Sequence, residues 1–84
     1  MAIRYVIWDT EDEPHGNVRH IGEHGLTPED VEDVLFGVHE LDSSRHSGSP
    51  VAFGFTSSGM YICVVFEWAD DDTVYPITAY PLDE

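Results

Sequence analysis

The sequence LTPEDVEDVLFGV, residues 26–38, predicts the element around which the fold is arranged. Thr27 can cap the amino terminus of a helix, and Pro28 suits the first helical position. Apolar residues then recur at the spacing of one helical face, at Val31, Val34, Leu35 and Val38. The acidic residues between them face water, and Gly37 marks the end. The segment therefore predicts an amphipathic helix from about residue 28 to residue 36, with one face for packing.

The partner of this helix is predicted to be a small antiparallel β-sheet. Three strands are expected in the second half of the chain, at residues 51–56, 60–68 and 73–80. The second of these is apolar on both faces except at Glu67, which is typical of a strand near the middle of a sheet. Pro76 cannot donate a ladder hydrogen bond, so the last strand should lie at an edge there or carry a bulge.

The first half of the chain adds a strand and a short helix. Residues 3–8 are β-branched and aromatic, which favours a strand. Residues 14–24 can form a short helix with Val18 and Ile21 facing inward, ended by Gly25 in a left-handed conformation. Residues 42–50 read as a polar loop. The predicted fold is a single α+β domain over residues 1–84, in the order β-α-α-β-β-β.

The charge balance restricts the kinds of partner. Seventeen acidic residues stand against three arginines and no lysine, so the net charge is −14. Such a surface repels nucleic acid at long range, because phosphates are normally held by Lys and Arg. The acidity fits a basic protein partner, a cation site, or an adaptation for solubility. Cys63 is the only cysteine and lies in an apolar run, so we interpret it as a core residue.

No targeting signal is recognised in the sequence. No apolar stretch approaches the roughly 20 residues that span a bilayer. No apolar run of the signal-peptide kind follows the first four residues, Met1-Ala2-Ile3-Arg4. We therefore expect a cytoplasmic protein without a membrane partner.

Several short strings, taken in order, resemble a known family. They are Trp8-Asp9, Asn17, His24-Gly25, Val34-Leu35-Phe36, Val51-Ala52-Phe53-Gly54, Val64-Val65-Phe66 and Ile77-Thr78-Ala79. Their order and spacing make nearly the whole chain similar to BrnT, the toxin of a type II toxin–antitoxin pair and a compact relative of RelE-type ribonucleases. The resemblance implies an RNA-cleaving toxin that needs no metal and is neutralised by a cognate antitoxin.

The resemblance also points to candidate catalytic residues. Metal-free RNA cleavage needs a base for the ribose 2′-hydroxyl, an acid for the leaving oxygen and cations for the phosphate. The candidates in this sequence are His24, His20, Arg19, Arg45 and Tyr80. BrnT-like sequences carry basic residues at three places that are held here by Glu23, by Gly48-Ser49 and by Tyr80. We therefore expect a weakened or lost catalytic site.

Two other classes of function stay open. The first is a non-catalytic acidic module on the same fold that binds a basic protein, whether an antitoxin or another partner. The second is a small metal-binding domain, because His20 and His24 share a helical face at i, i+4 and carboxylates such as Asp9, Glu11 or Glu23 are near in sequence. The sequence predicts no cofactor and no resident metal, leaves dimer formation open, and makes RNA a partner disfavoured by charge.

Overall fold

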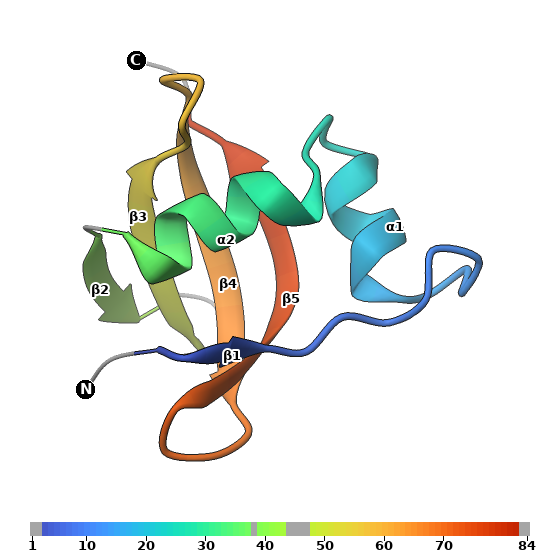
Figure 1. Cartoon of the computed structure of the whole chain (residues 1–84), viewed down its shortest axis with the longest axis horizontal. Helices are drawn as coiled ribbons and strands as arrows, with labels where there is room; N and C mark the ends of the chain where they lie inside the picture. The colour runs from blue at the N-terminus through green and yellow to red at the C-terminus, as the bar shows by residue number, and fades with distance from the viewer. Residues whose placement is uncertain (1–2, 38, 44–47, 83–84) are drawn as a thin grey trace.

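A five-stranded mixed sheet with two short helices packed on it forms the fold in the computed structural model, which describes residues 3–37, 39–43 and 48–82 (Figure 1). The elements are β1 (Tyr5–Val6), α1 (Asn17–Gly22), α2 (Pro28–Phe36), β2 (Glu40–Ser43), β3 (Pro50–Phe55), β4 (Tyr61–Trp68) and β5 (Thr73–Pro81). The strands lie in the order β1-β5-β4-β3-β2. The predicted α+β fold is confirmed, with one strand more than expected. No helix within the described ranges is long and apolar enough to cross a membrane.

The helix α2 forms as the sequence predicts, because its start is capped from both sides. The Thr27 hydroxyl accepts a hydrogen bond from the Asp30 backbone N–H at 3.3 Å, and the Asp30 carboxylate accepts one from the Thr27 N–H at 3.0 Å. Val31, Val34 and Leu35 are buried against the sheet, where α2 crosses in front of the strands (Figure 1). Residue 38, the last of the predicted apolar face, lies outside the described residues.

The strand β4 lies at the centre of the sheet, between β3 and β5. Ile62, Val64 and Phe66 have no exposed surface, and Cys63 is buried on the other face of the strand. The prediction that this segment lies near the middle of the sheet is confirmed, but its second face is only partly covered, because Tyr61 and Val65 beside Cys63 are half-buried. The core consists of Ile62, Val64 and Phe66 together with buried side chains of both helices, of β3 and β5, and of the segments before β1 and α2.

The strand β5 carries the bulge that its proline predicts. Val65 pairs with Thr78 and Phe66 with Pro76, so Ile77 is left without a partner in the ladder. On the other side, β1 runs parallel to β5 and pairs only at Tyr5 with Thr73 and at Val6 with Val74. From residue 75 onward the outer side of β5 is therefore open to α1, which lies beside it (Figure 1).

Three parts of the prediction need correction. The sheet is mixed, because β1 is parallel to β5, and this first strand has two residues where six were expected. Of the polar loop predicted for residues 42–50, Asp42, Ser43 and Pro50 are strand residues, because β2 pairs antiparallel with β3 from Glu40 to Ser43, and residues 44–47 lie outside the described residues. The helix α1 spans only Asn17–Gly22, and a turn follows in which Gly25 has the expected positive φ of 81°.

Candidate functional site

The buried Asn17 side chain joins α1 to the strands at the point where β1 and β5 separate. Its amide nitrogen donates to the carbonyl oxygens of Ile7 at 3.0 Å and Pro76 at 2.9 Å. Its amide oxygen accepts from the Asp9 backbone N–H at 2.9 Å. The side chain thus satisfies backbone groups that a continued strand pair would otherwise satisfy. Asn17 therefore fixes the position of α1 relative to β5.

Asp9 supports the same arrangement from the connection before α1. Its carboxylate accepts from the first helical N–H, that of Asn17, at 3.0 Å and from the Tyr75 hydroxyl at 2.6 Å. The Tyr75 bond is the main reason that the pKa of Asp9 lies below its ordinary value, and the Asn17 N–H contributes further. The same bond raises the pKa of Tyr75. Asp9 and Tyr75 thus act as structural partners of α1.

Three of the five candidate residues meet where α1 lies against β5, a place that we call the α1–β5 junction (His20, His24 and Tyr80). The His20 Nδ1 atom lies 3.3 Å from the Ile77 carbonyl oxygen, at the bulge. The His24 and Tyr80 rings have centroids 6.0 Å apart and planes tilted by 59°. All three side chains are exposed.

The pKa of Tyr80 is raised by the residue opposite it in the neighbouring strand. Cys63 is the residue opposite Tyr80 in β4. Its thiol, as hydrogen-bond partner, raises the pKa of Tyr80, and burial adds to this effect. Tyr80 is therefore a neutral phenol near pH 7. Burial chiefly raises the pKa of the Cys63 thiol as well, which fits its interpretation as a core residue.

The two candidate arginines add little to this junction. Arg19 is exposed on α1 next to His20 in the sequence, but successive helical residues point about 100° apart. It forms no ion pair with any described residue. Arg45 lies outside the described residues. Glu23, the residue before His24 in the sequence, is exposed.

The metal-binding alternative gains no support from the geometry. Within the residues that the structure describes, no three His, Cys, Asp or Glu side chains come together as a metal site. His20 is bonded to a backbone carbonyl and His24 lies against Tyr80, so their nearest partners are not carboxylates.

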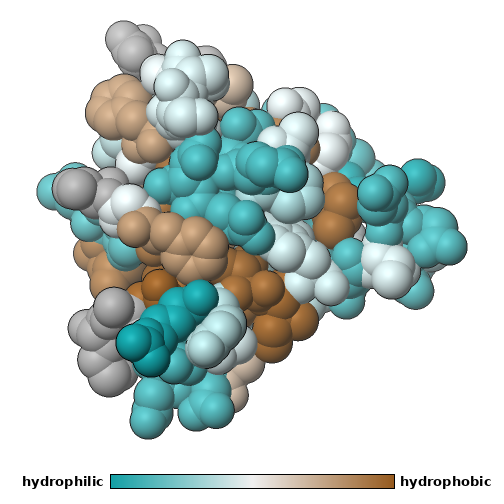
Figure 2. All heavy atoms as spheres, in the orientation of Figure 1, coloured by the Kyte–Doolittle hydropathy of each residue, from teal (hydrophilic) through white to brown (hydrophobic). Residues whose placement is uncertain are grey.

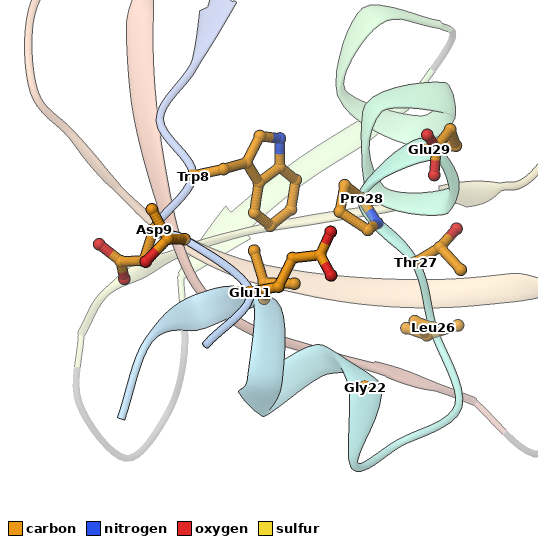
Figure 3. A pocket seen from close by; sticks show the side chains of 10 residues that line it. Trp8, Asp9, Glu11, Gly22, Leu26, Thr27, Pro28 and Glu29 are labelled. Carbon is orange, nitrogen blue, oxygen red and sulfur yellow. The ribbon is translucent and has the colours of Figure 1, made fainter. Parts of the chain in front are cut away.

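Three surface grooves lie outside the α1–β5 junction. The largest, about 700 Å³, is lined by Trp8, Asp9, Thr10, Glu11, Val18, Gly22, Leu26, Thr27, Pro28 and Glu29 (Figure 3). Two smaller grooves, about 390 and 430 Å³, lie at the end of α2 and share Asp33 and Gly37. No described Arg or His lines any of the three, and each contains at least one carboxylate. Figure 2 shows hydrophilic side chains over the outward face of α2.

The sequence indicates the two histidines and Tyr80 as candidates, but it does not indicate the residues that hold α1 against β5. In the sequence Asn17 enters only the family resemblance, and Asp9 has no further role than that of a carboxylate near a possible metal site. An Asn at the start of a helix, eight residues after an Asp, is a weak signal by itself, and only the structure shows that they bond to each other. Comparison with known protein families, curated proteins and solved structures finds no match. The placement of the side chains is therefore the ground for a functional proposal.

Proposed function

We propose that this chain is a BrnT-like toxin of a type II toxin–antitoxin pair, a metal-independent ribonuclease whose remaining catalytic groups lie at the α1–β5 junction. The observation that carries this proposal is the pairing of His24 with Tyr80, with ring centroids 6.0 Å apart on an exposed surface. An imidazole and a phenol are suited to exchange protons with one substrate at neutral pH. The cognate antitoxin is the expected protein partner.

In this proposal the two rings divide the proton transfers between them. The neutral His24 imidazole takes the proton of the ribose 2′-hydroxyl, and the 2′-oxygen attacks the adjacent phosphorus. The bond to the 5′-oxygen breaks, and this leaving oxygen takes the Tyr80 phenol proton. Tyr80 can act as the acid because a phenol carries its proton near pH 7. His20 donates through Nδ1 to the Ile77 carbonyl, and its second ring nitrogen can donate to a phosphate oxygen when the ring is an imidazolium.

The electrostatic part of the site is poor, which predicts a slow enzyme. Arg19 is the only candidate arginine among the described residues, and Glu23 is exposed beside His24. Removing one preorganised contact to the developing charge commonly costs on the order of a hundredfold in rate. Few phosphate contacts also mean weak RNA affinity. The proposal therefore includes weakened activity.

The test is the growth of a bacterial host during tightly induced expression of the chain. It needs no choice of substrate and includes cleavage of RNA held on ribosomes. We expect growth arrest by the wild type, and relief by His24→Ala and by Tyr80→Phe. His15→Ala, which removes an exposed histidine outside the junction, is the matched control and should arrest growth like the wild type.

Two results would contradict the proposal. One is normal growth while the wild-type chain accumulates as soluble protein. The other is growth arrest that His24→Ala leaves unchanged, because the junction would then not be the source of toxicity.

A second candidate function is a non-catalytic acidic module that binds a basic protein. It is favoured by the grooves, each of which contains carboxylates and no described basic residue. Charge complementarity of this kind accelerates association and makes it strongly dependent on salt. Normal growth with soluble protein in the test above would favour this candidate.

A further inference from the structure

The largest groove lies on the side of α1 away from the proposed catalytic residues. Val18 and Gly22 line it. Since each helical residue turns about 100°, these two share one face of α1 and His20 lies on the opposite one, while His24, in the turn after the helix, lies against Tyr80 of β5. The groove therefore has no part in the proposed ribonuclease chemistry. What it binds can be inferred independently of the proposed function.

The Trp8 indole is held in place at this groove. Its N–H donates to the Glu32 carboxylate at 2.9 Å, and the side chain packs against the core while staying partly exposed. Figure 3 shows the indole and the Glu11 side chain beside Pro28, around a common space. A negative charge bonded to the indole N–H increases electron density on the ring, which strengthens its attraction for a cation over its face.

The rim of the groove is negatively charged and the floor is apolar. Glu11 and Glu29 line it, are exposed, and have no hydrogen-bond or ionic partner among the described residues. The Asp9 carboxylate is already bonded to the Tyr75 hydroxyl and to a backbone N–H. The apolar floor is formed by Trp8, Val18, Leu26 and Pro28. Free carboxylates around a fixed aromatic ring favour a cation with an apolar stem.

The start of α2 does not turn this groove into an anion site. A helix amino terminus attracts anions through its unpaired N–H groups. Here the Thr27 N–H is bonded to the Asp30 carboxylate, the Asp30 N–H is bonded to the Thr27 hydroxyl, and Pro28 has no N–H. The carboxylate of Asp30 also offsets the positive end of the helix dipole.

We propose that this groove binds an arginine side chain displayed by a basic partner protein. The planar guanidinium stacks on the Trp8 indole and pairs with Glu11 and Glu29, and its aliphatic stem covers the apolar floor near Leu26. Arginine fits better than lysine because its flat, weakly hydrated cation stacks on aromatic faces and donates to two carboxylates at once.

The test is an NMR titration of the ¹⁵N-labelled chain with an acetylated and amidated Gly-Arg-Gly peptide at low ionic strength. We expect the Trp8 Nε1–H resonance to shift while that of Trp68 stays in place. The Gly-citrulline-Gly peptide, which has the same shape without the charge, should leave both resonances unchanged. If the citrulline peptide shifts Trp8 equally, the cation is not what is recognised and the proposal is wrong.

A pair of double variants separates this site from general attraction to an acidic protein. Glu11→Gln with Glu29→Gln should weaken binding on the order of tenfold, as expected from the loss of charge-assisted hydrogen bonds. Glu40→Gln with Asp71→Asn makes the same change in net charge at exposed positions outside the groove and should have no such effect. Equal weakening by both pairs would overturn the proposal.

A small molecule that carries a guanidinium group is the alternative ligand for this groove. Agmatine carries the guanidinium on its stem without a peptide backbone. Binding of the peptide at least as tight as that of agmatine supports a protein-borne arginine. Binding of agmatine alone would replace the partner protein with a small-molecule cation and so overturn the proposal.

Discussion

Replacing Asn17 by Ala should strongly destabilise the domain. The side chain makes three hydrogen bonds that Ala cannot make, to the carbonyls of Ile7 and Pro76 and from the N–H of Asp9. The bond to Pro76 is buried, so that carbonyl loses its partner without gaining water. The helix α1 would then be held to β5 by the burial of Ile21, by the His20 bond to Ile77, and by Asp9 through Tyr75.

The expected loss follows from the burial of each bond. A buried group left without a partner costs about 1–3 kcal/mol, and each of the two partly buried bonds is worth roughly 0.5–1.5 kcal/mol net. Because these contributions are not additive, we expect a loss of about 3 kcal/mol in the free energy of unfolding. A domain of this length has a total of roughly 4–13 kcal/mol. The melting temperature should fall by roughly 12–24 °C.

Urea unfolding followed by tryptophan fluorescence and circular dichroism measures this loss. Arg19→Ala, an exposed change on the same helix, is the control and should stay within about 0.5 kcal/mol of the wild type. Asn17→Asp keeps an acceptor for the Asp9 N–H but loses both donors and adds a second carboxylate, so it should destabilise at least as much as Ala. A loss under about 1 kcal/mol for Asn17→Ala would refute the role assigned to this side chain.

Two further predictions concern titrating groups. The lowered pKa of Asp9 means that its ionised form stabilises the fold fully above its ordinary pKa of 3.8, and that this contribution disappears as the pH falls through the lower folded pKa. Tyr75→Phe removes the main cause, so its loss of stability relative to wild type should be larger near pH 7 than near pH 3; an equal loss in urea unfolding at both pH values would contradict this. Because burial raises the pKa of the Cys63 thiol, Ellman's reagent should label the folded chain slowly and the urea-unfolded chain promptly. Rapid labelling of the folded chain would show that this thiol is accessible.

The sequence predicts best those elements whose signals are local. The helix α2 has its cap, its proline and its apolar face within one short segment, and all three act as expected. Pro76, which has no N–H to donate, predicts an edge position or a bulge in the last strand, and a bulge lies beside it. In both cases the deciding chemistry lies within the segment itself, so no knowledge of the neighbouring elements is needed.

The elements that the sequence missed depend on a neighbour. Glu40, Leu41 and Asp42 in β2 are all exposed and join the sheet through backbone hydrogen bonds to β3, so no alternation of apolar side chains marks the strand. The first strand ends early because the chain turns away from β5 after Val6, and nothing in its β-branched composition indicates that departure.

The candidate site also combines a local feature, which the sequence predicts, with contacts between distant residues, which it does not predict. The spacing of His20 and His24 predicts that they share one helical face. In the structure α1 ends at Gly22, and His24 lies in the turn that follows. The approach of Tyr80 to His24 depends on the register of the sheet and on Asn17, which docks α1 against β5. These are long-range contacts, and single-sequence reasoning contains no information on which distant residues meet.

The pairing of β1 and α1 with β5 has a consequence for synthesis of the chain on the ribosome. The Asn17 bond to Pro76 joins residues 59 positions apart in the sequence. While Pro76 is still inside the exit tunnel, the early segments have no docking surface and the α1–β5 junction does not exist. The junction therefore forms only after most of the chain has been synthesised, and a partner that binds the early segments during translation would reach them before they dock on β5.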